Sequence, residues 1–158
     1  MKANDINTIL FNPVWTSRLL HYFLSGAHSI PNKNIKFELI YLVLPFIYDD
    51  LIFEKLKRLN KKSTFNSLFN NEELKNCLIR KDEQMVSFTD ITNDALIYLG
   101  NQTQIYIDKH ILAKSVLKYQ NENKDPFLKD YYKAAYNLGI IFAKEDYLTI
   151  FLRIGAKS

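Results

Sequence analysis

Asp49 and Asp50, three histidines and a single cysteine are the side chains whose types could support acid–base, metal or thiol chemistry. General acid–base catalysis needs two carboxyl groups in opposed environments, which neighbours on one turn rarely provide, so helix capping is the favoured role of the acid pair. The histidines lie in three separate segments, and no nearby pair of carboxylates completes a metal set, so we interpret them as satisfied or solvated side chains. Cys77 stands alone, which excludes an intramolecular disulfide and a Cys-based zinc site and favours simple packing.

The motifs of nucleotide binding and of hydrolysis are missing from the sequence. It contains no GxxxxGKS or GxxxxGKT phosphate cradle, no GxGxxG, no GxSxG and no HExxH. The sequence therefore predicts a protein that is not an enzyme and that holds no cofactor and no metal.

The densest basic stretch offers another kind of chemistry, which is contact with an anionic surface. It consists of Lys55, Lys57, Arg58, Lys61 and Lys62. These side chains could contact nucleic-acid phosphates, or they could form a solvated face or meet an acidic partner protein. The segment around residues 90–99, which precedes a predicted hairpin, carries Asp90 and Asp94 and no Lys or Arg, so it is a poor surface for a DNA groove. We therefore favour a solvated or protein-facing role over DNA contact.

Tyr131 and Tyr132 belong to an aromatic stripe near the C-terminus. Core packing is the default role of such a stripe. Tyrosine is also a frequent anchor in protein interfaces, so these two residues are candidates for partner contact as well.

The composition predicts which elements must position these side chains. The chain has 158 residues, of which 47% are hydrophobic, and it contains only four Gly and four Pro. Long helices with few turns follow from this composition, in one domain over residues 1–158. Caps and apolar spacing predict helices over residues 13–25, 36–48, 51–59, 82–99, 127–144 and 147–154, and short ones after Thr64 and near Asn71. Gly26 and Gly100 are predicted to end helices, and Pro45 to kink or end one.

Two alternating apolar runs, residues 104–107 and 111–114, flank Asp108, Lys109 and His110 and predict a short β-hairpin. A helix followed by a small hairpin is the outline of a winged helix-turn-helix. We therefore predict a mainly α fold, a compact helical domain with a small β-hairpin that is winged helix-turn-helix-like.

The longest apolar run, residues 39–48, is too short to cross a membrane that needs about 20 residues. The N-terminus shows no signal-peptide core, and cysteine usage is minimal. We expect a soluble, cytoplasmic protein.

Short hydrophobic motifs resemble those of a known family. The chain has Asn12-Pro13-Val14-Trp15 followed by a Leu pair, then Leu44-Pro45-Phe46 in the central apolar segment. It closes with residues 138–144 (LGIIFAK) and 149–155 (TIFLRIG). This pattern is similar to the middle components of three-component ABC-ATPase (ABC-3C) systems. It departs from them at Ile141-Phe142, where the family has Trp-Phe, and after Ile154-Gly155.

The resemblance implies a three-part system with a large SMC/Rad50-like ABC ATPase and a component that carries the effector. The middle component would bridge the two, and such systems are associated with defence against phage. Our leading hypothesis is a non-catalytic adaptor in which the basic stretch and the two tyrosines contact partners, with nucleic acid reached only through the complex. The alternative is a winged-helix DNA-binding protein, such as a repressor or a phage-DNA sensor, in which the basic stretch grips phosphates.

Overall fold

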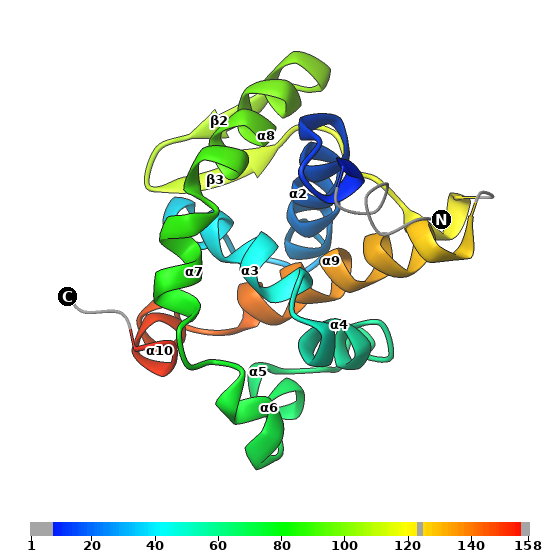
Figure 1. Cartoon of the computed structure of the whole chain (residues 1–158). Coiled ribbons are helices and arrows are strands. Elements are labelled where there is room, and N and C mark those ends of the chain that lie inside the picture. The colour runs from blue at the N-terminus through cyan, green and yellow to red at the C-terminus, as the bar shows by residue number, and fades with distance from the viewer. Residues whose placement is uncertain (1–7, 123–124, 156–158) are drawn as a thin grey trace.

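The computed structural model describes residues 8–122 and 125–155, which are mostly helical with one small sheet (Figure 1). The α-helices are α2 (Pro13–His28), α3 (Val43–Ile47), α4 (Asp50–Leu56), α5 (Phe65–Leu68), α6 (Glu72–Asn76), α7 (Lys81–Ser87), α8 (Thr89–Gln102), α9 (Pro126–Lys144) and α10 (Tyr147–Arg153). The 3-10 helices and strands are η1 (Phe37–Leu42), η2 (Tyr119–Asn121), β1 (Ile35–Lys36), β2 (Ile105–Ile107) and β3 (His110–Ala113). The predicted mainly α fold with a small hairpin is confirmed.

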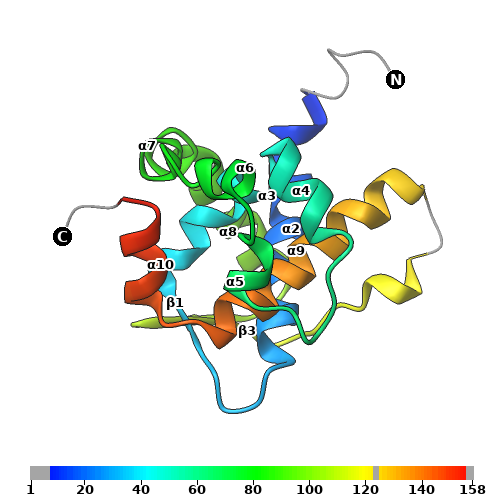
Figure 2. The same ribbon diagram turned by 90° about the horizontal axis from the view of Figure 1, so that it is seen from below.

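The two longest helices, α2 and α9, begin in the same way. Asn12 and Asp125 are their N-caps, and each side chain accepts a hydrogen bond from a backbone N–H two residues further on. Pro13 and Pro126 follow at the first helical position, where a missing N–H is harmless. The two helices pack against each other, and Figure 2 shows α9 crossing α2 obliquely.

Glycines bring α2 and α9 into backbone contact. A Cβ on Gly26 would lie 1.9 Å from the carbonyl oxygen of Tyr136, and a Cβ on Gly139 would lie 1.9 Å from that of Phe23. Real Cβ atoms do not approach other atoms this closely, so only glycine fits at either position. The prediction that Gly26 ends its helix is wrong, since α2 continues to His28 because the neighbouring helix fixes this glycine in helical conformation.

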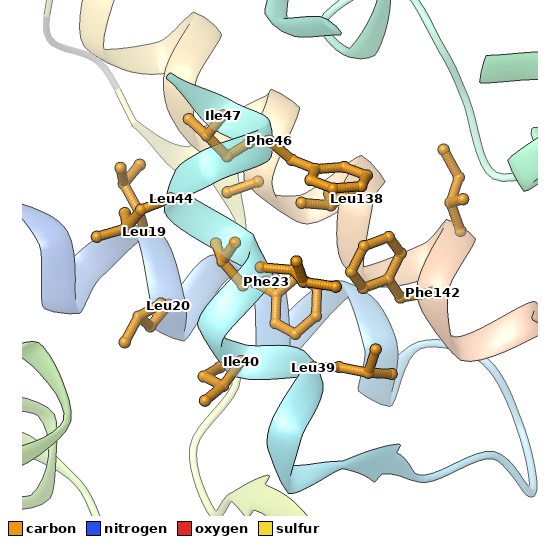
Figure 3. Packing of buried hydrophobic residues seen from close by; sticks show 14 of the residues in the cluster. Leu19, Leu20, Phe23, Leu39, Ile40, Leu44, Phe46, Ile47, Leu138 and Phe142 are labelled. Atoms are coloured by element: carbon orange, nitrogen blue, oxygen red, sulfur yellow. The ribbon is translucent and has the colours of Figure 1, made fainter. Parts of the chain in front are cut away.

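The segment from η1 to α3 crosses α2 and α9 and supplies much of the core (Figure 3). Leu39, Ile40, Leu44, Phe46 and Ile47 are at most 2% exposed. They meet side chains of the two long helices, which are Leu19, Leu20, Phe23, Leu138 and Phe142. Burying one Leu or Phe side chain stabilises the fold by about 1.5–3 kcal/mol, so this layer is a large part of the folding free energy.

One continuous helix over residues 36–48 was predicted, and the structure divides that segment into β1, η1 and α3. Pro45 is the third residue of α3, where its missing N–H would have no partner within the helix. The α-helix therefore begins just before the proline, and the tighter 3-10 helix precedes it. The helix predicted over residues 82–99 is likewise divided, into α7 and α8 at Phe88, and α8 runs through Gly100 to Gln102.

The sheet has the strand order β1-β3-β2, and its pairs are antiparallel. The predicted hairpin is confirmed as β2 and β3, in which Tyr106 is opposite Leu112 and Ile107 is opposite Ile111. The additional strand β1 pairs with β3 through Ile35 opposite Ile111. Figure 1 shows the hairpin directly after α8, on the side of the molecule away from α5 and α6.

Candidate functional site

The basic stretch lies at the end of α4 and in the loop that follows it. The Lys57 ammonium group is 3.0 Å from a Glu54 carboxylate oxygen and 4.0 Å from one of Asp130. The Arg58 guanidinium group lies 3.7 Å from the same Glu54 carboxylate. Two of the five candidate cations are therefore already paired with acids of α4 and α9.

The rest of the stretch differs from these two. Within the described part of the chain, Lys55, Lys61 and Lys62 have no ion-pair partner. Lys61 and Lys62 are exposed. Lys144 of α9 holds their loop, because its ammonium group donates hydrogen bonds to the carbonyl oxygens of Lys61 and of Ser63, the latter at 3.0 Å. Burial lowers the pKa of Lys144, and the nearby charge of Lys61 lowers it further.

The two candidate tyrosines have different environments. Tyr132 is only 7% exposed and stacks on Tyr22 with ring centroids 4.6 Å apart. The guanidinium carbon of Arg18 lies 5.4 Å from the centre of the Tyr132 ring. Tyr131 is half-buried and stacks on Phe53 of α4 at 4.3 Å. Both rings hold α9 against its neighbours, and only Tyr131 has substantial surface left for another molecule.

A polar network on α2 was not predicted. The Tyr22 hydroxyl donates a hydrogen bond of 2.6 Å to Glu122, and Arg18 forms an ion pair with the same carboxylate. Burial raises the pKa of Tyr22, and its hydrogen bond to Glu122 raises it further. This network ties α2 to the residue that follows η2.

His21 faces a hollow of about 310 Å³ between α2, α8 and the segment after β3. Its Nε2 atom lies 2.8 Å from the carbonyl oxygen of Ser115 and 3.2 Å from the Ser115 hydroxyl. Burial lowers the pKa of His21, and this outweighs the opposite effect of the Ser115 carbonyl. His21 is therefore a satisfied, mostly buried histidine, in agreement with the sequence interpretation.

Asp49 caps α4, as predicted, and also meets a buried cation that the sequence analysis missed. The Asp49 side chain accepts hydrogen bonds from the backbone N–H groups of Leu51 and Ile52. The ammonium group of Lys81, a residue only 1% exposed, lies 3.0 Å from Asp49 and 2.9 Å from the side-chain oxygen of Gln84. Cys77 is close by, and burial together with the Asp49 charge raises its thiol pKa. This ion pair joins α7 to the start of α4.

The hairpin exposes apolar side chains, which the sequence analysis did not identify as a site. Tyr106 is 48% exposed, Ile107 49% and Leu112 40%. These three residues, together with Asn34, Asp108 and His110, help to line a shallow hollow of about 590 Å³ over the sheet. Exposed apolar side chains gathered on one short hairpin in this way mark surfaces that contact other molecules.

The comparison with protein families decides the membership of the chain. A family model described as ABC-three component (ABC-3C) system Middle Component 3 matches residues 2–158. The chain belongs to this family. The resemblance in the short hydrophobic motifs is thereby confirmed, and membership in a multi-component system implies partner components. No curated protein and no solved structure matches the chain.

Residues 8–122 and 125–155 lack two further features of this kind. Those residues include no group of three or more His, Cys, Asp or Glu side chains that could hold a metal ion. They also include no helix with the length and apolar character needed to cross a membrane.

Proposed function

We propose that this middle component is a non-catalytic adaptor that bridges the ABC ATPase and the effector component of an antiphage ABC-3C system. The observation that carries the proposal is the family match over residues 2–158, because a middle component belongs with other components. We also propose that residues 1–158 act as one domain. In support, one cluster of buried side chains includes residues from α2 through α10.

Two apolar surfaces on different elements support a bridging role. The first is the hairpin with Tyr106, Ile107 and Leu112. The second is on α10, where Leu148 is 54% exposed and Leu152 is 76% exposed, four residues further along the same face. An adaptor needs separate surfaces for separate partners, and these two surfaces lie on different elements of the fold.

Coexpression of the chain with the other components of its system tests the adaptor role. We expect the tagged chain to copurify with the ATPase and the effector component, and to show no ATPase or nuclease activity alone. Cells that carry the complete system should lose protection in a phage plaque assay when this gene is deleted. Failure to copurify with either component would contradict the proposal, and activity of the purified chain alone would contradict its non-catalytic part.

A winged-helix DNA-binding protein is the alternative function. The strand order β1-β3-β2 and the position of α8 directly before the hairpin agree with a winged-helix outline, and Lys61 and Lys62 are exposed. Against it, α8 carries Asp90 and Asp94 on its exposed side and no Lys or Arg. Binding to duplex DNA at low and high salt distinguishes the two functions, since phosphate contacts weaken steeply as salt rises. We expect no salt-sensitive DNA binding by the chain alone.

A further inference from the structure

The strand β2 lies at the edge of the sheet, and its hydrogen-bond pattern shows which backbone groups face outward. The N–H of Lys114 donates to the carbonyl of Gln104 at 2.8 Å, and the N–H of Asp108 donates to that of His110 at 3.0 Å. In an antiparallel pair the bonded positions alternate, so residues 104, 106 and 108 face β3. The N–H and C=O groups of Ile105 and Ile107 therefore point away from the sheet. Within residues 8–122 and 125–155 these groups have no backbone partner.

The side chains beside this edge are apolar on both faces of the sheet. Ile105 and Ile107 share one face with Ile111 and Ala113, their opposite residues on β3. Tyr106 and Leu112 are opposite each other on the other face, and both are exposed. An antiparallel sheet with one face in water usually carries polar side chains on that face. Apolar residues on both faces are typical of a strand that is covered by something else.

The charge around this edge favours one kind of occupant. Residues 89–108, which run from the start of α8 through β2, contain no Lys, Arg or His, although the chain has 21 Lys and Arg. The same residues contain Asp90, Asp94 and Asp108. The nearest cations along the hairpin are Lys109 in the turn and Lys114 after β3. A complementary partner is therefore basic, and a nucleic-acid backbone is disfavoured.

We infer that β2 accepts an extended, basic segment of another component of the system as an additional strand. The free N–H and C=O groups of Ile105 and Ile107 would pair with the backbone of that segment. Tyr106 and Leu112 would pack against its apolar side chains, and its Lys or Arg residues would meet Asp108 and the carboxylates of α8. This inference rests on the proposed adaptor function and names the surface and the chemistry by which one partner is held.

Proline substitution tests the edge directly. Ile107→Pro removes an outward N–H and leaves the bonds between β2 and β3 in place, a position where proline is tolerated in sheets. We expect it to weaken capture of one coexpressed component on the order of tenfold, because edge hydrogen bonds and packing are lost together. Ile79→Ser, at a position after α6 that is 66% exposed and belongs to neither apolar surface, is the matched control and should leave capture of that component unchanged. Circular dichroism and thermal unfolding check that each variant is folded.

A second variant replaces the proline test if Ile107→Pro fails to fold. Tyr106→Lys with Leu112→Lys places two cations on the outward face without touching the core, and it should repel a basic segment. Overlapping peptides tiled across the two partner components then identify the segment, and binding should be confined to a basic, alternating apolar peptide and fall as salt rises.

The outcomes separate this inference from the adaptor role. If the wild-type chain captures its partners and both edge variants capture them equally well, the inference is overturned while the adaptor role stands. If the wild-type chain captures neither component, both proposals fall. If the edge variants convert a dimer of this chain into a monomer, a second copy occupies β2 and the inference is wrong.

Discussion

The α2–α9 contact and the α4–α7 junction hold helices together by opposite means. Between α2 and α9 the backbones meet through Gly26 and Gly139, with aromatic rings packed around them. Between α4 and α7 the contact depends on the ammonium group of Lys81 and the carboxylate of Asp49. The first contact depends on the absence of a Cβ atom and the second on the presence of a charge. The two should therefore respond to different substitutions.

Gly139→Ala should have the largest effect. Its Cβ would lie 1.9 Å from the carbonyl oxygen of Phe23, so the two helices must move apart and the core around them must open. We expect the free energy of unfolding to fall by about 3 kcal/mol or more, measured by urea denaturation. Gly100→Ala is the control, because its Cβ would meet only the Ile105 side chain at 3.5 Å. That variant should gain up to about 1 kcal/mol of helix propensity. Equal effects of the two substitutions would show that α2 and α9 are not in backbone contact.

Lys81→Met should have an intermediate effect. It removes the cation but leaves the Asp49 carboxylate, which remains partly exposed and still accepts the capping hydrogen bonds of α4. We expect a loss of about 2–3 kcal/mol in the free energy of unfolding, less than for a fully buried charge left unpaired. The double variant with Asp49→Asn should cost less than the sum of the single variants. Additive losses in this double-mutant cycle would indicate that the two charges do not interact.

The pH dependence of stability should show the smallest effect, and it should come from His21. Because burial lowers the pKa of His21 below its ordinary value of 6.5, the unfolded chain takes up a proton more readily than the folded chain. The contribution of neutral His21 to the free energy of unfolding is present above the unfolded-state pKa of 6.5. This contribution is lost as the pH falls through the lower pKa that His21 has in the folded state. Between about pH 7.5 and about pH 5 the wild-type chain should therefore lose more stability than His21→Gln. An identical loss in both proteins would remove His21 as the cause, and the glycine contact should not respond to pH at all.

Local signals in the sequence were sufficient for the caps and for the hairpin. Asn12, Asp49, Thr64 and Asp146, which precede predicted helices, each accept a capping hydrogen bond at the start of the helix. Such bonds form within a few residues, so the sequence pattern contains all that they require. The alternating runs that became β2 and β3 are equally local.

The features that could not be predicted depend on distant residues. Gly26 has the sequence signal of a helix end, and only the backbone of α9 makes it an interior residue of α2. Strand β1 is two residues long and exists because β3 is beside it. Nothing near Lys81 in the sequence indicates burial, since its partner Asp49 is on another helix. The exposure of Tyr106 and Leu112 was likewise undetectable, because alternation alone does not reveal which face of a strand is covered.

The contact between Gly26 and Tyr136 also constrains when the protein can fold. Its two sides are separated by most of the polypeptide, so α2 leaves the ribosome long before the helix that covers it has been made. Until then Leu19, Leu20 and Phe23 lack the side chains of α9 that share their buried cluster. Contacts between residues so far apart in the sequence form slowly. Before α9 is present, the exposed apolar face of α2 can associate with non-native surfaces. We therefore expect this middle component to reach its native state after α9 has been synthesised. Stepwise folding that starts from α2 alone is disfavoured.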